Sequence, residues 1–330
     1  MLLRNIQQTK SPSSVKIFMV SLCLIFASGQ IMAANKAKCQ SSLYMLESVP
    51  EYDHARYAPT PVERFYDGKA FVSSLDGNDD DDEYLLNGDP EGEYLIQPQW
   101  VAVHIKGYLN QNGEAGFAPG YKRPKWYKIP EFNIERSKMG LKGRIDDSYR
   151  GVGKIWNRGH YAQRSDANRM GPEYGCNTHV FANAFPQHAD LNQGIWLGLE
   201  FYISSLANQV GDVWVVTGPI FTKAPEFIGD KDEVPVAVPD KVFKVLVWNE
   251  GENTNVISFI YPNHPGDEAF KTGRCSADKT YDHTLYLSTI YEIETKTGLT
   301  FFGEGNEEFK KQMATQLPPV EEKYRVGNCI

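Results

Sequence analysis

The sequence predicts an α+β domain in which helices pack on a mostly antiparallel sheet. Short runs rich in β-branched and aromatic side chains predict strands. One longer stretch, 191–207, places Leu191, Ile195, Leu199 and Tyr202 on one side of a helix. No internal repeat or low-complexity linker divides the pattern, so one main domain is expected. The predicted strands are 213–216, 242–248 and 256–261, and two further helices are predicted at 287–297 and 306–316.

The amino terminus has the pattern of a signal peptide. Three basic residues and no acidic residue precede an apolar run at 17–27, and small residues follow at Ala33 and Ala34. We therefore expect residues 1–34 to be removed, which predicts a secreted or periplasmic protein with no stable membrane association afterwards. A mitochondrial transit peptide would be amphipathic rather than carry a compact apolar run. An uncleaved anchor is the other alternative, although the run is short for a span.

Residues 35–94 are predicted to form an amino-terminal extension, and residues 95–330 the main domain. The extension is rich in Tyr, Pro and Asp, and its densest acidic run is 79–83. That run lacks the glycine and the closing glutamate of a calcium loop. We therefore expect an exposed acidic loop rather than a calcium site.

Four cysteines remain once Cys23 has left with the signal peptide. An even number in an exported chain predicts two disulfides, and three pairings are possible. We expect Cys39 to pair with Cys329, which would join the two ends, and Cys176 to pair with Cys275 across a long loop. A zinc site is the rival interpretation, but no CxxC spacing supports it.

Charge is distributed unevenly along the chain. The full sequence carries a net charge of −8, and removal of the three basic residues of the signal peptide leaves −11. Residues 122–169 instead hold 13 Lys and Arg against 5 Asp and Glu, a net of +8. A basic face on an acidic body can steer a polyanion to one place, whereas scattered solvated charges are the alternative interpretation.

Two short segments carry the candidate chemistry. The first reads Asn-Arg-Gly-His at 157–160, and the second reads Asp-Leu-Asn-Gln-Gly-Ile-Trp at 190–196. His160 is a candidate general base, because imidazole titrates near neutral pH. Arg158 offers a planar fork for phosphate oxygens, and Gly159 leaves room for a close approach.

The second segment offers oxygen ligands for a hard cation. Asn192 supplies a neutral amide oxygen, and Mg²⁺ keeps several waters, so one or two protein oxygens can hold it. Glu200 lies about two helical turns further on and on roughly the same side, where it would hold a metal-bound water or orient Asn192. Taken alone, each residue has a plainer interpretation: a structural histidine, a helix cap or a solvated helix charge. Together the two segments indicate metal-assisted cleavage of a phosphodiester.

These segments resemble the signature segments of the DNA/RNA non-specific endonucleases. This group of ββα-metal nucleases includes secreted bacterial nucleases and mitochondrial endonuclease G. The resemblance covers roughly residues 95–317. Further matching stretches are Tyr-Arg-Gly at 149–151, an Asn-x-x-Pro-Gln stretch within 181–187, Gly-Pro within 217–220, the strand at 238–245, and Ile-Glu-x-x-Thr-Gly-Leu-x-Phe-Phe at 293–302.

The resemblance implies a ββα-metal nuclease fold and a set of site residues. A strand through His160, a connecting stretch and the helix carrying Asn192 would form the ββα element. His160 would be the general base and Asn192 the direct ligand of Mg²⁺, with Mn²⁺ or another divalent cation as the alternative. Glu200 would hold the metal through water. The remaining implied site residues are Arg158 and Arg123, as phosphate contacts, and Asn183, as a supporting hydrogen-bond partner.

One position departs from the family pattern. The family motif begins with Asp, and this chain has Asn157 there, which keeps an acceptor oxygen but loses the charge. We expect a metal-dependent endonuclease that hydrolyses DNA and RNA and that contacts the backbone rather than base edges. The alternative is a catalytically weak, secreted nucleic-acid-binding protein that keeps the nuclease fold.

Overall fold

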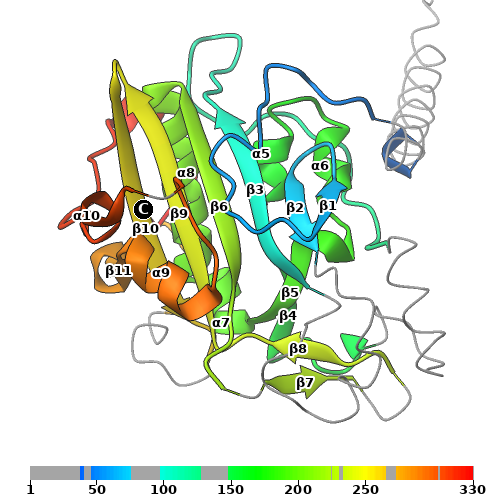
Figure 1. Cartoon of the computed structure of the whole chain (residues 1–330). Coiled ribbons are helices and arrows are strands. Elements are labelled where there is room, and N and C mark those ends of the chain that lie inside the picture. Colours follow the sequence, from blue (N-terminus) through cyan, green and yellow to red (C-terminus); the bar gives the residue numbers. More distant parts are fainter. Residues whose placement is uncertain are drawn as a thin grey trace, which may run out of the picture.

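The centre of the molecule is a seven-stranded sheet. The computed structural model describes residues 38–40, 46–75, 97–127, 148–223, 225–229, 233–264, 273–303 and 305–329. The strand order is β1-β2-β3-β6-β9-β10-β11, and every neighbouring pair is antiparallel (Figure 1). The strands are β1 (Arg64–Asp67), β2 (Val72–Leu75), β3 (Pro98–Lys106), β6 (Asp212–Ile220), β9 (Lys241–Glu250), β10 (Asn253–Pro262) and β11 (Leu287–Ser288).

Helices cover both faces of this sheet. The long helix α8 (Ile195–Val210) packs on one face and α9 (Ile290–Thr297) on the other (Figure 1). Alternation along β6 explains the two layers, because Val215 joins the core with α8 while Val216 joins the core with α9. The predicted α+β class is confirmed, and the three predicted strands lie within β6, β9 and β10. The shorter helices are α5 (Arg164–Ala167), α6 (Tyr174–Asn177), α7 (Ala189–Gln193) and α10 (Glu307–Lys310).

Two small antiparallel pairs lie below the main sheet in the view of Figure 1. Strand β4 (Trp156–His160) pairs with β5 (Ala184–His188), and β7 (Glu226–Ile228) pairs with β8 (Val236–Val238). Strand β5 leads directly into α7, so β4, β5 and α7 provide the two strands and the helix of the predicted ββα element.

Two predicted segments fall wholly outside the described residues. They are the signal peptide at 1–34 and the acidic run at 79–83. Within the described ranges, no helix combines the length and the apolar character that a membrane span requires.

The predicted helices differ from the observed ones in three places. The stretch predicted as one helix at 191–207 is divided at Gly194 into α7 and α8, because the backbone of Gly194 leaves the helical region (φ −110°, ψ −116°). The helix predicted at 287–297 begins at Ile290, since the two residues of β11 pair with β10 first. The helix predicted at 306–316 ends with α10, because few apolar side chains follow and Met313 is exposed.

The disulfide pairing differs from the predicted one. Cys39 is joined to Cys176 in α6, and Cys275 is joined to Cys329, with Cα–Cα distances of 5.7 and 5.5 Å. The predicted pairs Cys39–Cys329 and Cys176–Cys275 are therefore wrong. The physical reason is separation, since residues 38–40 lie on one side of the molecule and the carboxyl-terminal end on the other (Figure 1).

Candidate active site

Strand β4 and helix α7 bring the two sequence segments together. Strand β4 pairs with β5 so that His160 lies opposite Ala184, and α7 carries Asn192 directly after β5. Gly159 has a different use from the expected one. A Cβ at this position would collide with the buried side chain of Gln187, so the glycine makes room for the protein's own packing rather than for an approaching substrate.

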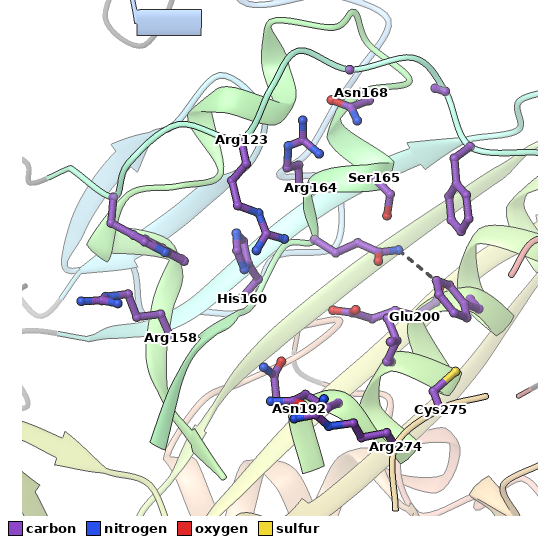
Figure 2. Close-up of a pocket in the computed structure, with 18 residues that line it drawn as sticks. Arg123, Arg158, His160, Arg164, Ser165, Asn168, Asn192, Glu200, Arg274 and Cys275 are labelled. Carbon is purple, nitrogen blue, oxygen red and sulfur yellow. Dashed lines mark hydrogen bonds between the residues drawn. The ribbon is translucent and has the colours of Figure 1, made fainter. Parts of the chain in front are cut away.

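A cleft of about 700 Å³ lies where four segments meet: 117–126, the end of β4 with α5, α7 with α8, and the loop at 274–275. Figure 2 shows that these segments direct charged and polar side chains into one space. Five of the six residues predicted for the site line this cleft, namely His160, Arg158, Arg123, Asn192 and Glu200.

The sixth predicted residue, Asn183, lies behind the cleft and is fully buried. Its Nδ2 donates to the backbone oxygens of Ala162 at 2.8 Å and Thr178 at 3.0 Å. Its Oδ1 accepts from the backbone N–H of Ala162 at 2.8 Å. These bonds fix the chain immediately after His160, so Asn183 supports the end of β4 and does not face the cleft.

His160 is enclosed by aromatic and imidazole rings. The ring centroid of Trp126 lies 4.7 Å from that of His160, and the centroid of His179 lies 4.9 Å away. The Nε2 atom of His160 is buried and has no hydrogen-bond partner among the described residues. Burial, reinforced by His179, Arg123 and Arg164, holds the pKa of His160 well below its ordinary value of 6.5. The imidazole is therefore neutral at neutral pH, the form that can accept a proton.

Asn157 forms a small network with the second segment. Its Nδ2 donates to the Gly153 carbonyl at 2.9 Å. Its Oδ1 accepts from Asn192 Nδ2 at 2.9 Å and from Gln193 Nε2 at 2.8 Å. The residue that departs from the family motif thus holds the amide nitrogen of Asn192 and leaves the amide oxygen free of this network.

Glu200 lies on α8 at the wall of the cleft, with 9% of the residue exposed. Burial raises the pKa of its carboxyl group above the ordinary range, while Lys244 opposes this shift and Asp166 adds to it. Lys244 is itself buried, and its Nζ donates to Thr217 Oγ1 at 3.1 Å and lies 4.4 Å from the ring centroid of Trp196. Lys244 is therefore a buried basic group whose charge acts on the carboxyl group of Glu200.

The cleft contains residues that the sequence segments did not indicate. Gln163 and Arg164 follow β4, and Gln163 Nε2 donates to the Glu200 carbonyl at 3.3 Å (Figure 2). Their nearness to the histidine in the sequence was a usable signal. Arg274 enters the cleft from a loop that the disulfide of Cys275 holds in place. Because the predicted partner of Cys275 was wrong, the sequence did not place Arg274 in the cleft.

The cleft is positively charged. Among the described residues that line it, four guanidinium groups stand against one carboxylate, that of Glu200, and three of the four arginines come from the basic segment 122–169. Planar guanidinium groups match phosphate oxygens in pairs, so the cleft suits an anion that carries several phosphate groups. The lining arginines are Arg123, Arg158, Arg164 and Arg274.

The fold and the site together define a ββα nuclease domain. The sequence matches the model of the DNA/RNA non-specific endonucleases over residues 83–308. The chain therefore belongs to the DNA/RNA non-specific endonuclease family.

Individual relatives are similar over part of their length. The mitochondrial nuclease EXOG of Danio rerio is 28% identical over 220 residues, which cover 62% of this chain and 55% of the relative. Human mitochondrial endonuclease G is 34% identical over 161 residues, which cover 46% of this chain and 50% of the relative. A nuclease of Nostoc is 25% identical over 241 residues, covering 66% of this chain and 80% of the relative. The chain thus spans about half the length of the mitochondrial relatives it matches.

A solved structure supports the fold. The crystal structure of the EndoG/EndoGI complex matches with a TM-score of 0.50 and 20% sequence identity, covering 76% of this chain and 89% of that chain. This match indicates a common arrangement of sheet and helices.

Proposed function

We propose that this protein is an exported, Mg²⁺-dependent endonuclease that hydrolyses phosphodiester bonds of DNA and RNA. One observation carries the proposal: a neutral histidine, an oriented asparagine, a glutamate and four arginines line a single cleft. Family membership supports the same chemistry. Guanidinium groups that contact phosphates carry no sequence information, which would account for a lack of sequence preference.

The residues of the cleft fit a hard divalent cation. In the described part of the chain, no three His, Cys, Asp or Glu side chains converge on one point, which disfavours a fully protein-bound metal such as structural zinc. Mg²⁺ instead keeps several waters and needs one or two protein oxygens. Asn192 would supply its amide oxygen directly, and Glu200 would hold a coordinated water. Mn²⁺ offers similar ligand preferences.

The catalytic roles follow from atoms and charge. His160, neutral and at the wall of the cleft, would accept a proton from the attacking water. Arg158 and Arg123 would hold the phosphate oxygens and favour the more highly charged transition state. Asn183 would keep the histidine in place through the bonds at the end of β4. A bound divalent cation would supply charge neutralisation at the phosphate and stabilise the leaving oxygen.

Export is the second part of the proposal. The sequence pattern of residues 1–34 is that of a signal peptide, and two disulfides favour an oxidising compartment. Relatives whose names place them in mitochondria share the nuclease domain. The cellular location would therefore be set by the leader and not by the fold. Expression of the full chain with a carboxyl-terminal tag, followed by mass measurement of exported protein, would show whether the chain begins near Ala34. Retention of residues 1–34 in the mature protein would contradict this part.

Plasmid nicking tests the activity. Purified protein is incubated with supercoiled DNA or with RNA, in Mg²⁺, in Mn²⁺ and in EDTA. We expect cleavage of both polymers with the metals and none with EDTA. Nucleic-acid binding without cleavage under every metal condition would instead establish the alternative, a binding protein that keeps the nuclease fold.

A further inference from the structure

An exposed aromatic ring lies in the cleft. Phe117 is 49% exposed, and among the exposed large hydrophobic side chains of the described residues it alone lines the cleft. Its ring centroid lies 5.4 Å from that of Phe201, with 55° between the ring planes. Phe201 belongs to α8, one residue after Glu200, and lines the same cleft. An aromatic surface therefore adjoins the proposed catalytic groups.

The backbone around Phe117 is anchored on both sides. Before it, Asn110 closes a tight turn, since its Oδ1 accepts from the N–H of Asn112 at 2.8 Å and of Glu114 at 3.0 Å. After it, Gly120 packs so closely on Asn168 that a Cβ would collide with the amide. The exposure of the ring is therefore a property of a fixed segment and not of a loose end.

Phe201 is also held from behind. A Cβ at Gly327 would collide with the Phe201 ring, so the carboxyl-terminal segment packs directly against it. That segment is joined to the cleft wall by the Cys275–Cys329 disulfide. The Phe201 ring that Phe117 contacts is thus packed against the carboxyl-terminal segment, which limits its movement.

Segment 117–126 combines the Phe117 ring with positively charged side chains that can bind phosphate. Arg123 follows Phe117 by six residues, and both side chains line the cleft. Arg164 donates to the Tyr121 carbonyl between them and lines the cleft as well. Proteins that bind single strands combine a basic groove for the backbone with aromatic rings on which bases stack. A solvent-exposed phenylalanine beside arginines matches that combination.

We propose that Phe117 stacks on an unpaired base next to the scissile phosphate, so that the protein prefers single-stranded nucleic acid. The inference rests on the proposed nuclease function of the cleft. In a duplex the faces of each base are covered by the neighbouring bases. The Phe117 ring can therefore contact a base face only after the base has been unstacked, which costs free energy. Single strands offer their base faces without that cost.

Binding measurements test the inference in a protein that cannot cleave. In a His160→Ala background, each variant is titrated with a short single-stranded DNA that contains 2-aminopurine, and with the same strand in a duplex. We expect Phe117→Ala to weaken single-strand binding by roughly 5-fold to 100-fold, to remove the quenching of 2-aminopurine, and to leave duplex binding nearly unchanged. Phe117→Tyr should bind as the parent does, and Phe117→Leu should resemble Phe117→Ala because it keeps bulk but lacks a ring.

Two controls separate stacking from folding. Leu109→Ala removes an exposed apolar side chain of the preceding turn, and Phe65→Ala removes an exposed ring on β1, both outside the cleft. Both should bind single strands as the parent does. An equal loss on single strands and duplex, or full binding by Phe117→Leu, would overturn the inference. If the wild-type protein cleaves DNA but Phe117→Ala binds single strands as the His160→Ala parent does, base stacking is refuted and the proposed function stands. A wild-type protein that cleaves nothing would refute the proposed function instead.

Discussion

The amide nitrogen of Asn192 lies 2.9 Å from Oδ1 of Asn157, and this contact decides which end of the Asn192 amide is left for the cleft. The polarity is set by the backbone. The Gly153 carbonyl can only accept, so the Asn157 group that meets it at 2.9 Å is the donor Nδ2. Oδ1 of Asn157 must then receive the Asn192 nitrogen, and the Asn192 oxygen is directed elsewhere.

Substitution of Asn157 tests this relationship. In Asn157→Asp, a carboxylate still accepts from Asn192 and Gln193 and loses only the bond to Gly153, so we expect turnover to change by less than about tenfold. In Asn157→Ala, the Asn192 amide loses the partner that orients it. Turnover should then fall by roughly 10–100-fold and the Mg²⁺ requirement should rise. Initial rates across a Mg²⁺ titration measure both.

The outcomes for Asn157 have distinct meanings. Wild-type Mg²⁺ dependence in Asn157→Ala would remove the orienting role. A large gain in activity at neutral pH in Asn157→Asp would identify this chain as a weakened nuclease and favour the binding-protein alternative. An acidic limb of the pH–rate profile displaced upward in Asn157→Asp would show that the new anion reaches His160 and favours its protonated form.

His160→Ala tests the general base. We expect turnover to fall by roughly 10²–10⁴-fold, because the attacking water loses its proton acceptor. Folding and binding of nucleic acid in EDTA should be almost unchanged. His264→Ala, which removes an exposed histidine outside the cleft, serves as the matched control and should cleave normally. Cleavage by His160→Ala within a few-fold of the wild type would reassign the base.

The metal site predicts an order of effects. Asn192→Ala should cut activity severely and raise the Mg²⁺ concentration needed for half-maximal rate, because it removes the direct oxygen ligand. Glu200→Ala should do so more mildly, since its hold on the cation passes through water. The exposed Glu252 lies in the turn between β9 and β10, and Glu252→Ala is the control for a lost carboxylate. Equal Mg²⁺ dependence in all of these proteins would refute the metal site as described.

Acid sensitivity is predicted from a buried histidine away from the cleft. His283 is 4% exposed, its Nδ1 lies 2.9 Å from the Tyr261 hydroxyl, and burial lowers its pKa from 6.5 to about 4. Between these values the unfolded chain binds more protons than the folded one, so stability rises with pH and is lost as pH falls. His283→Gln should reduce the slope of unfolding free energy against pH by up to about 1.4 kcal/mol per pH unit between about pH 4 and 6.5.

Urea unfolding at several pH values measures that slope. His54, also buried and with a pKa lowered to about 4, remains in the variant, so part of the acid sensitivity should persist. The exposed His264 provides the control, and His264→Gln should keep the wild-type slope. An unchanged slope in His283→Gln would show that this histidine does not carry the linkage.

The local sequence pattern predicted the strands and helices whose formation depends on neighbouring residues. The strands within β6, β9 and β10 follow from β-branched alternation, because each face of the sheet meets its own helix layer. The two segments proposed to carry the chemistry could also be identified from the sequence, since the residue types at His160 and Asn192 suit a general base and a ligand for a hard cation. Features that depend on contacts between distant parts of the chain could not be predicted from the sequence. The chain at Gly273 packs closely on Gly194 where the helix is divided, and the use of Gly159 depends on Gln187 across a strand pair. Arg274 lies on a loop that is held at the cleft by the Cys275–Cys329 disulfide and by the backbone bond from Cys275 to Gln193, and the sequence specified neither contact.

The two disulfides close consecutive stretches of chain, 39–176 and 275–329, and neither stretch contains a cysteine of the other. A polypeptide emerges from the ribosome with its amino end first. If the leader is removed as proposed, Cys23 leaves with it, and Cys39 and Cys176 are the first two remaining cysteines to emerge. The second pair then forms from the only thiols left. Oxidation in the order of synthesis therefore yields the native pairs, and an enzyme that oxidises dithiols suffices. A nested pairing would instead have needed an isomerase, because the first disulfides to form would have had to be rearranged.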